Sequence, residues 1–301
     1  MKISILLPLK ENFSPIYPGA VSLFVNDTLK ISKYKKNCIV YGNTNYKKKF
    51  KLKYKNIFIK KTIFKGQNKS YVEEFAKLEK KTNSNLIELH NRPIYLKYLV
   101  KLLSNKNYIL YFHNDPLTMN GSKSISERTF LLKTCFKIIF NSNWSKKRFL
   151  EGLENKFINS DKLVVFFQSA KKNSKKILKN KKKWITFVGK LNSAKGYDIF
   201  AKTIVKVLNK HNDWKAKIIG DEKREKISLR HDNADILGFL NHEKVLNIFK
   251  KTSIAIACSR WEEPFGRTSL EASANGCAVI ITNKGGLPET VTNAKILNNT
   301  W

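Results

Sequence analysis

Short, almost wholly apolar runs alternate with longer amphipathic stretches along the chain. The first run, Ile3–Leu7, ends at Pro8, and later runs in the first half lie at 37–41, 85–89, 108–112, 137–142 and 163–167. Such runs are typical of strands buried on both faces of a parallel sheet. Stretches with helical spacing lie between them, among others at 69–82, 93–103, 124–136 and 144–153. This alternation predicts α/β units whose strands are joined by right-handed crossovers.

A Lys-rich stretch, 171–183, interrupts the alternation, and a block of like charge is typical of a solvated linker. The alternation then resumes, with predicted strands at 184–189, 214–220, 234–238, 253–259 and 278–282. Helical spacing is found between these strands at about 195–210, 242–250 and 267–275. We therefore predict two facing Rossmann-like α/β domains, 1–170 and 184–301, joined by the linker 171–183.

The composition fits a folded protein with an unusual charge. The 301 residues are 42% hydrophobic, which excludes a chain that is disordered as a whole. Lys and Arg outnumber Asp and Glu by 58 to 23, a net charge of +35, which favours nucleic acid or an anionic membrane surface as a partner. Only seven of the 58 basic residues are Arg, the preferred residue for phosphate and base recognition, which argues against nucleic acid. The excess is +29 over 1–183 and +6 over 184–301, so the two parts differ in surface.

The sequence shows no targeting or membrane-spanning segment. The apolar run after Lys2 is too short for a signal peptide, and no run approaches the ~18 apolar residues of a transmembrane helix. Cys38, Cys135, Cys258 and Cys277 form no paired motif, which favours buried thiols over disulfides or a zinc site. We expect a cytoplasmic protein whose basic face can hold it at the inner, anionic face of a membrane.

Candidate chemistry concentrates in the second domain. There a predicted strand leads through an acidic turn with Glu263 into a helix that begins near Gly266, Arg267 and Thr268. Ligands of open α/β sheets bind beyond the carboxyl ends of strands, and helix N-termini attract phosphate. Glu263 and Glu271 can therefore face one cleft and accept hydrogen bonds from the hydroxyls of a polyol. On these two residues alone, a helix-capping Glu263 and a solvated Glu271 remain the favoured alternative.

A second cluster follows the predicted strand 184–189. Gly189 ends that strand, Lys190 and Lys195 flank a short loop, and Gly196 opens the next helix. Two lysines beside a strand-to-helix junction can hold a diphosphate as point charges. In a chain this rich in lysine, each of them taken alone is more simply explained as a solvated surface group.

Taken together, these two clusters and the Gly-Gly-Leu-Pro-Glu sequence at 285–289 resemble the family 4 retaining glycosyltransferases, which have the GT-B fold. The family's paired glutamates correspond to Glu263 and Glu271, and its glycine- and lysine-containing loop corresponds to Gly189–Gly196. The resemblance is strong after residue 184 and looser before it. It implies transfer of a hexosyl group from a nucleotide-diphosphate sugar to a glycan, lipid-linked or lipopolysaccharide-type acceptor. It also implies retention at the anomeric carbon and no metal or other cofactor.

The resemblance further implies a role for each motif residue. Glu263 would contact hydroxyls of the donor sugar, and Glu271 would contact the ribose. Lys190 and Lys195 would neutralise the departing diphosphate, where negative charge develops in the transition state. Backbone N–H groups around Phe265–Thr268 would complete this site. The reaction would be a front-face displacement in which no carboxylate forms a covalent intermediate.

Four further positions come from the same resemblance. Gly189 belongs to the diphosphate loop, Gly238 borders the base, and Gly19 opens the first helix beside the diphosphate. His90 and His113 both end predicted strands, and His113, which Asn-Asp follows, better matches the family's histidine near the reacting sugar. We therefore add His113 to the candidate catalytic residues. The remaining histidines are assigned no role.

The sequence departs from the family pattern at its end, and other functions remain open. Only 12 residues follow Glu289, where the family continues through further helices, so we expect a C-terminal truncation. A nucleic-acid-binding protein is one alternative, because the stretch 46–61 interleaves aromatic residues with Lys. A nucleotide-sugar epimerase and an inactive glycan-binding homologue of the same fold are the others.

Overall fold

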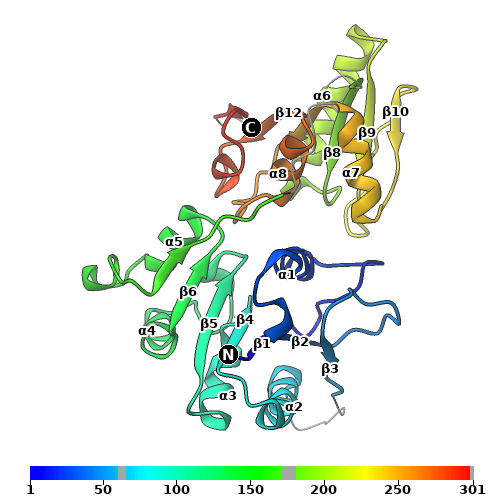
Figure 1. The fold of residues 1–301 in the computed structure, drawn as a ribbon. Helices are drawn as coiled ribbons and strands as arrows, with labels where there is room; N and C mark the ends of the chain where they lie inside the picture. Colours follow the sequence, from blue (N-terminus) through cyan, green and yellow to red (C-terminus); the bar gives the residue numbers. More distant parts are fainter. Residues whose placement is uncertain (60–65, 171–180, 299–301) are drawn as a thin grey trace. The chain divides into compact units, whose positions relative to one another are not determined.

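The computed structural model describes residues 1–59, 66–170 and 181–298 (Figure 1). The chain divides into two compact units, Met1–Phe166 and Phe167–Trp301. In each unit the described residues form one sheet in which every neighbouring pair of strands is parallel. Both units are therefore α/β, as the alternation of apolar runs and amphipathic stretches predicts.

The described part of the first unit contains a seven-stranded sheet. Its strands are β1 (Ile3–Leu6), β2 (Cys38–Gly42), β3 (Tyr54–Asn56), β4 (Leu86–His90), β5 (Asn107–Phe112), β6 (Lys137–Phe140) and β7 (Leu163–Val165). Its α-helices are α1 (Ala20–Ile31), α2 (Gln67–Thr82), α3 (Ile94–Leu102), α4 (Ile125–Thr134) and α5 (Asn143–Leu150). The strand order is β3-β2-β1-β4-β5-β6-β7, so the order reverses between β1 and β4.

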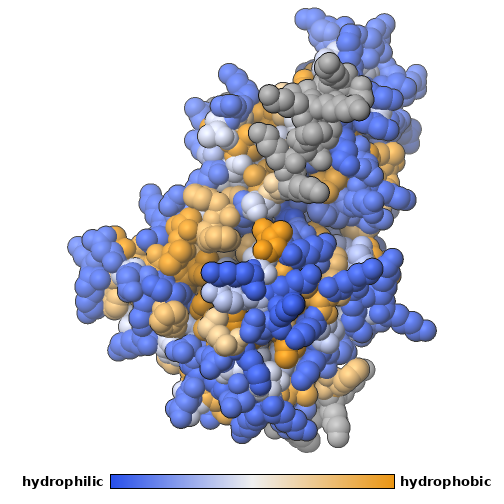
Figure 2. All heavy atoms as spheres, in the orientation of Figure 1, coloured by the Kyte–Doolittle hydropathy of each residue, from blue (hydrophilic) through white to orange (hydrophobic). Residues whose placement is uncertain are grey.

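Helices cover both faces of this first sheet. Ile3 and Ile5 pack with residues of α1, whereas Leu6 packs with residues of α2 and α3 on the opposite face, where these two helices lie side by side (Figure 1). Because both faces are buried, the strands are apolar runs instead of an alternating pattern. On the face of this unit that Figure 2 displays, hydrophilic side chains predominate and apolar side chains form smaller patches.

The described part of the second unit contains a six-stranded sheet. Its strands are β8 (Lys182–Val188), β9 (Lys215–Ile219), β10 (Ala234–Ile236), β11 (Thr252–Ala257), β12 (Ala278–Thr282) and β13 (Lys295–Leu297). Its α-helices are α6 (Tyr197–Lys210), α7 (His242–Lys251) and α8 (Arg267–Ala274). The order is β10-β9-β8-β11-β12-β13, so it reverses between β8 and β11. Ile185 and Phe187 pack with α6 on one face, and α7 and α8 pack on the other.

The predicted strands and helices are confirmed, with bounds that differ by a few residues. The edge strands β3 and β13 are the elements that the apolar pattern does not predict. The predicted linker 171–183 falls largely on 171–180, which lie outside the described residues, while Lys182 and Lys183 begin β8. All four cysteines are buried thiols, which confirms the prediction made from their spacing.

Gly196 occupies a point of the second unit where no side chain fits. Its φ is +70°, and a Cβ on it would lie 1.9 Å from the carbonyl oxygen of Cys258. We expect Gly196→Ala to lower the free energy of unfolding in urea by roughly 3 kcal/mol, because backbone strain and a clash with backbone add together. Gly66→Ala is the matched control, since a Cβ on Gly66 meets nothing within 4 Å. Equal losses for the two variants would contradict this account.

Candidate functional site

The loop between β8 and α6 carries the first group of predicted residues. It runs from Gly189 through a short 3-10 turn, Ser193–Lys195, to Gly196. The side-chain oxygen of Asn192 accepts a hydrogen bond from the Lys195 N–H (3.0 Å) and so caps this turn. The sequence thereby holds the start of the Lys195 side chain in a defined place beside the carboxyl end of β8.

This loop is bound to the loop that follows β11. The carbonyl oxygen of Ala194 accepts hydrogen bonds from the N–H groups of Arg260 (3.0 Å) and Trp261 (3.1 Å) and from the hydroxyl of Ser259 (3.1 Å). Since β8 and β11 are adjacent parallel strands, both loops leave the same, carboxyl edge of the sheet. The strand order reverses at this place, where open α/β sheets bind their ligands.

An ion pair joins the two loops through predicted site residues. The Nζ of Lys195 contacts Oε1 of Glu263, and the Glu263 side chain is only 15% exposed. The carboxylate predicted for a sugar and the ammonium predicted for a diphosphate therefore lie together. Each group holds the other in place at the edge where a ligand would bind.

Two consecutive glycines hold the backbone of Glu263. The N–H of Gly286 donates to the Glu263 carbonyl oxygen (2.6 Å), and the N–H of Gly285 donates to the carboxylate of Glu262 (2.5 Å). Gly285 has a φ of +59°, and a Cβ on it would lie 2.2 Å from the Glu263 carbonyl oxygen. The Gly-Gly sequence of the motif therefore permits the close approach that positions the acidic turn.

The first turn of α8 follows this acidic turn. Gly266 is its N-cap, with a φ of +105°, and Phe265 before it is buried (3% exposed). Arg267 and Thr268 are the first helical residues, and their N–H groups have no acceptor within the helix. A helix start of this kind favours an anion, which agrees with the role predicted for these residues.

Glu271 is a buried carboxylate held by the side chains of Arg267 and His242. It is 6% exposed, and its Oε1 accepts a hydrogen bond from Nε of Arg267 (2.6 Å) and lies 2.8 Å from Nε2 of His242. Burial acts to raise the pKa of Glu271, but the hydrogen bond from His242 and the charge of Arg267 outweigh it, so the pKa is lowered. Glu271 is therefore not the solvated helix residue of the alternative.

His242 is the site residue that the sequence does not reveal. It is the first residue of α7 and reaches Glu271 across 29 positions of sequence. Its only sequence signal is its place, at the start of a helix that opens beyond the carboxyl edge of the sheet. In the sequence analysis it receives no role, because no partner lies near it along the chain.

The structure separates the two predicted lysines and leaves space near the end of β9. Lys190 is exposed, and among the described residues its ammonium has no hydrogen-bond or ion-pair partner, unlike that of Lys195.

A Cβ on Gly220 would lie 1.8 Å from the carbonyl oxygen of Gly189, so these two backbones touch. Gly238 accepts the Gly220 N–H (2.9 Å) and has no atom within 4 Å of its own Cβ position.

In the first unit, Glu88, His90 and His113 form a hydrogen-bonded chain. Oε1 of Glu88 lies 2.7 Å from Nε2 of His90, and Nδ1 of His90 lies 2.9 Å from Nε2 of His113. Both imidazoles are buried, and that of His90 stacks on Tyr111. A carboxylate only accepts, so Nε2 of His90 donates to Glu88. In the tautomer of His90 that has no proton on Nδ1, this nitrogen accepts the Nε2–H of His113, and two other side chains then set the proton position of the predicted catalytic histidine.

Gly19, predicted to lie beside the diphosphate, lies against a carboxylate of the chain itself. It is the N-cap of α1, and a Cβ on it would lie 2.2 Å from Oε1 of Glu11. The same oxygen accepts hydrogen bonds from the N–H (2.8 Å) and the hydroxyl (2.9 Å) of Ser22. An anion at the start of α1 would therefore have to displace Glu11, a competitor that the sequence analysis misses.

The stretch 46–61 uses its aromatic side chains for packing. The ring centroids of Phe50 and Tyr54 lie 5.1 and 5.2 Å from that of Phe13. Two of the rings that a nucleic-acid-binding surface would offer for stacking are therefore occupied inside the unit. Residues 60 and 61 lie outside the described part.

Two searches over the described residues bear on metals and membranes. Within 1–59, 66–170 and 181–298, no three His, Cys, Asp or Glu side chains gather in a way that could hold a metal ion. In the same ranges, no helix has the length and apolar character needed to cross a membrane. Metal independence itself stays a prediction.

Comparison with known families matches the part of the chain that carries this site. Residues 169–300 match the family model described as glycosyl transferases group 1. This range holds the ion pair between Lys195 and Glu263 and the buried Glu271. The match therefore falls on the second unit, where the candidate site residues Lys195, Glu263 and Glu271 lie.

Two curated relatives extend the match. Spore coat protein SA of Bacillus subtilis (strain 168) is 22% identical over 252 residues, which cover 75% of this chain and 67% of that protein. Lipopolysaccharide core biosynthesis mannosyltransferase LpsB of Rhizobium meliloti (strain 1021) is 29% identical over 121 residues, which cover 37% of this chain and 34% of that protein. The matched segments span about two thirds or less of the length of these relatives.

Solved structures resemble the whole chain. The crystal structure of Anabaena HepE in complex with UDP-glucose matches with a TM-score of 0.74 and 16% sequence identity. The match covers 99% of this chain and 85% of that chain. Together with the two parallel sheets between helices, this likeness confirms the predicted fold class, GT-B.

Proposed function

We propose that this chain is a retaining, metal-independent glycosyltransferase of family 4. It transfers a hexosyl group from a nucleotide-diphosphate sugar to a glycan, lipid-linked or lipopolysaccharide-type acceptor. The observation that carries the proposal is the Lys195–Glu263 ion pair where the strand order of the second sheet reverses. The group 1 match over 169–300 supports glycosyl transfer, and the UDP-glucose bound to Anabaena HepE supports a nucleotide sugar as donor.

The ion pair supports binding of two parts of the donor by two side chains, the diphosphate by Lys195 and the sugar by Glu263. The diphosphate competes with Glu263 for the ammonium of Lys195, and the hydroxyls of the sugar then take up the freed carboxylate. Because both side chains are already held at the carboxyl edge, little reorganisation is needed when the donor arrives. Glu263 acts as a positioning and electrostatic group in a front-face displacement, with no covalent intermediate.

Charge on the leaving diphosphate is compensated by the chain's own groups. Lys195, the exposed Lys190 and the N–H groups of Phe265–Thr268 surround the place beyond β8 and β11 where the diphosphate binds in this proposal. Negative charge grows on the leaving group in the transition state, so fixed cations and oriented N–H groups speed its departure. Gly238 leaves room for the base beside this site.

Glu271 takes the ribose in this proposal. A carboxylate that is ionised and held by Arg267 and His242 keeps its second oxygen, Oε2, in a fixed orientation toward hydroxyl donors. His242 therefore acts as a positioning residue for nucleotide binding. In this proposal the first unit binds the acceptor, and His113 is its catalytic residue.

The donor can be identified by its effect on thermal stability. A nucleotide-diphosphate sugar that binds the folded chain raises the Tm, so a screen over bases and sugars names both parts of the donor. We expect Glu271→Gln to weaken binding of that donor about 10-fold, because an uncharged amide is a poorer acceptor for a hydroxyl than a carboxylate. Glu243→Gln, on the exposed first turn of α7, is the matched control. Undiminished donor binding by Glu271→Gln would contradict the ribose assignment.

Because the pKa of Glu271 is lowered, the stability of Glu271→Gln should depend on pH differently from that of wild type. A carboxyl whose folded pKa lies below its usual value of 4.5 contributes stability above that value, and the contribution is lost as the pH falls through the folded pKa. Wild type should therefore lose more stability in acid than Glu271→Gln does, as followed by urea unfolding at several pH values. Identical pH profiles for the two proteins would contradict the lowered pKa.

A further inference from the structure

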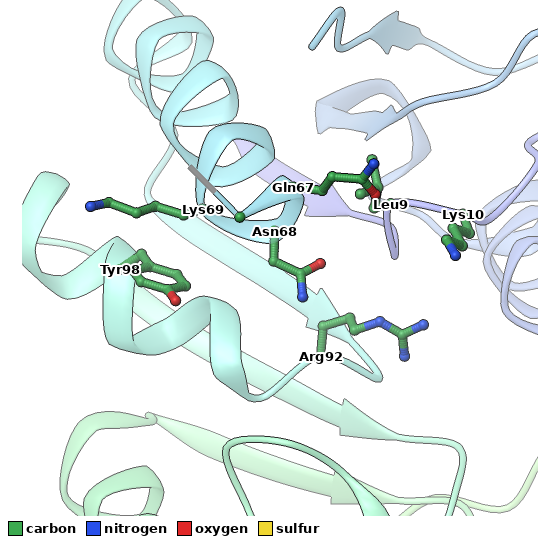
Figure 3. A pocket seen from close by; sticks show the side chains of 8 residues that line it. Leu9, Lys10, Gln67, Asn68, Lys69, Arg92 and Tyr98 are labelled. Atoms are coloured by element: carbon green, nitrogen blue, oxygen red, sulfur yellow. The ribbon is translucent and has the colours of Figure 1, made fainter. Parts of the chain in front are cut away.

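The first unit contains a cavity that the donor chemistry does not use. It has a volume of about 580 Å³ and is lined by Leu9, Lys10, Gly66, Gln67, Asn68, Lys69, Arg92 and Tyr98 (Figure 3). These residues come from the loop after β1, the start of α2, the loop after β4 and helix α3. All of them belong to the first unit, so the cavity is defined within that unit alone.

The position of the cavity in the sheet is one that favours a ligand. β1 and β4 are adjacent parallel strands, and the loops that carry Lys10 and Arg92 leave their carboxyl ends. The order of the strands reverses between β1 and β4, with β2 and β3 on one side and β5 to β7 on the other. Crevices outside this point of reversal are where open α/β sheets bind ligands.

The charge of the lining points to an anion. Three of the eight lining residues are cationic and none is acidic. Arg92 donates to the carbonyl oxygen of Asn91 (2.6 Å) and to the hydroxyl of Tyr95, and it has no carboxylate partner among the described residues. Four of the six other arginines do have one, namely Arg148, Arg224, Arg260 and Arg267, whereas Arg128 and Arg230 have none among the described residues. The planar fork of Arg92 therefore keeps donors for a ligand with paired oxygens.

Uncharged donors surround the same space. Lys69 and Ser70 donate their N–H groups to the carbonyl oxygen of Gly66, whereas those of Gln67 and Asn68 have no acceptor within α2. In Figure 3 the amide of Asn68 extends from the start of α2 toward Arg92. Lys69 extends away from Arg92 in the same view, so the inference rests on Arg92 and on Lys10 from the opposite loop.

We propose that this cavity binds a phosphate group carried by the acceptor. The identification of the ligand as the acceptor rests on the proposed function, whereas the binding of phosphate by the cavity does not. Arg92 takes two phosphate oxygens through its fork, and Lys10 and the amide donors take the rest. Since one phosphate fills only part of 580 Å³, the remaining volume, beside Leu9 and Tyr98, holds the group to which the phosphate is attached.

Inorganic phosphate is the probe for this site. Phosphate added to the full chain should shift the NMR signal of the Arg92 Nε–H, which is identified by its disappearance in Arg92→Gln. Titration calorimetry should show Kd raised about 10-fold in Arg92→Gln and in Lys10→Gln, as expected for loss of one charge-assisted hydrogen bond. Arg230→Gln is the matched control, because Arg230 is exposed and the variant changes the net charge equally. An unmoved Arg92 signal, or equal weakening by Arg230→Gln, would overturn the proposal.

Acetate is the control that shows whether the cavity prefers phosphate to other anions. It carries a single charge and two oxygens, so it should bind this cavity more weakly than phosphate does. Acetate that shifts the Arg92 signal at equal or lower concentration would overturn the assignment to phosphate.

Vesicles distinguish the two sources of the phosphate. If the acceptor is a lipid, wild type should bind phosphatidylcholine vesicles that contain phosphatidic acid, and Arg92→Gln should bind them less. If it is a soluble phosphorylated glycan, phosphate binds but vesicle binding does not depend on Arg92. Binding of a nucleotide-diphosphate sugar, measured on the same variants, reports on the proposed function separately, because Arg92 and Lys10 lie outside the donor site.

Discussion

Replacing Glu263 with alanine is expected to lower the rate of sugar transfer about 1,000-fold, because the variant loses the carboxylate that positions the donor sugar in the transition state. The fold should persist, since the Glu263 side chain is partly exposed and its backbone is held by Gly285 and Gly286. The loss should appear in kcat as well as in kcat/KM, measured with the donor that the thermal screen identifies. Circular dichroism and Tm verify that the variant is folded.

The matched control for this change is Glu243→Ala, which removes an exposed carboxylate on α7 in the same unit. It should transfer sugar at the wild-type rate. Lys195→Ala, in contrast, should lose activity and weaken nucleotide-diphosphate binding, because Lys195 contacts the phosphates as well as Glu263 in the proposed site. Near-normal transfer by Glu263→Ala would remove the central residue of the proposed function. Retained donor binding without any transfer in wild type would instead favour an inactive glycan-binding homologue.

The elements of the fold could be predicted where burial leaves a pattern in the sequence. The central strands β1 and β11 are covered on both faces, and this burial appears along the chain as an apolar run. The edge strands β3 (Tyr54–Asn56) and β13 (Lys295–Leu297) each have only three residues, one of them a lysine, so no apolar run marks them. Their existence depends on pairing with β2 and β12, which a local pattern does not contain.

The site could be predicted as far as its chemistry lies in local motifs. Glu263, Glu271 and Gly196 were identifiable through the family motifs that they resemble, whereas position alone favours a helix-capping Glu263 and a solvated Glu271. The partner residues His242 and Glu11 were not identifiable. They contact Glu271 and Ser22, which lie far from them in the sequence and which only the folded chain brings close. Sequence treats Lys190 and Lys195 alike, and only the fold brings one of them to Glu263.

The second unit also shows why its glycines recur in the motif. Gly196, Gly285 and Gly266 all have positive φ, and at each of them a Cβ would come within 2.4 Å of another atom. These close approaches bring the β8–α6 loop, the acidic turn and the start of α8 together at one edge of the sheet. The glycines are therefore required by the geometry of the site, and the charged residues act within the space they define.

Replacing His113 with alanine is expected to lower the rate of transfer about 100-fold, since the variant loses a polar contact to the transferred sugar that the proposed function requires. His113 is hydrogen-bonded to His90, which in turn is hydrogen-bonded to Glu88. The kcat should fall more than KM rises, as measured in steady-state transfer assays. Wild-type kinetics for His113→Ala would contradict its place beside the sugar.

Substitution of Glu88 tests whether the hydrogen bonds through His90 orient His113 or whether these residues only pack beside it. We expect the carboxylate of Glu88 to keep the proton of His90 on Nε2 in wild type, so that Nδ1 of His90 accepts the Nε2–H of His113. Glu88→Leu removes this constraint, and the ring-nitrogen NMR signals of His113 should change from one tautomer to a mixture. The rate should fall about 10-fold, because part of the protein then presents the wrong nitrogen to the sugar. Glu154→Leu, at an exposed surface pair in the same unit, should change neither the tautomer nor the rate. A loss of rate in Glu88→Leu with the His113 tautomer unchanged would show that Glu88 supports the fold and does not position His113.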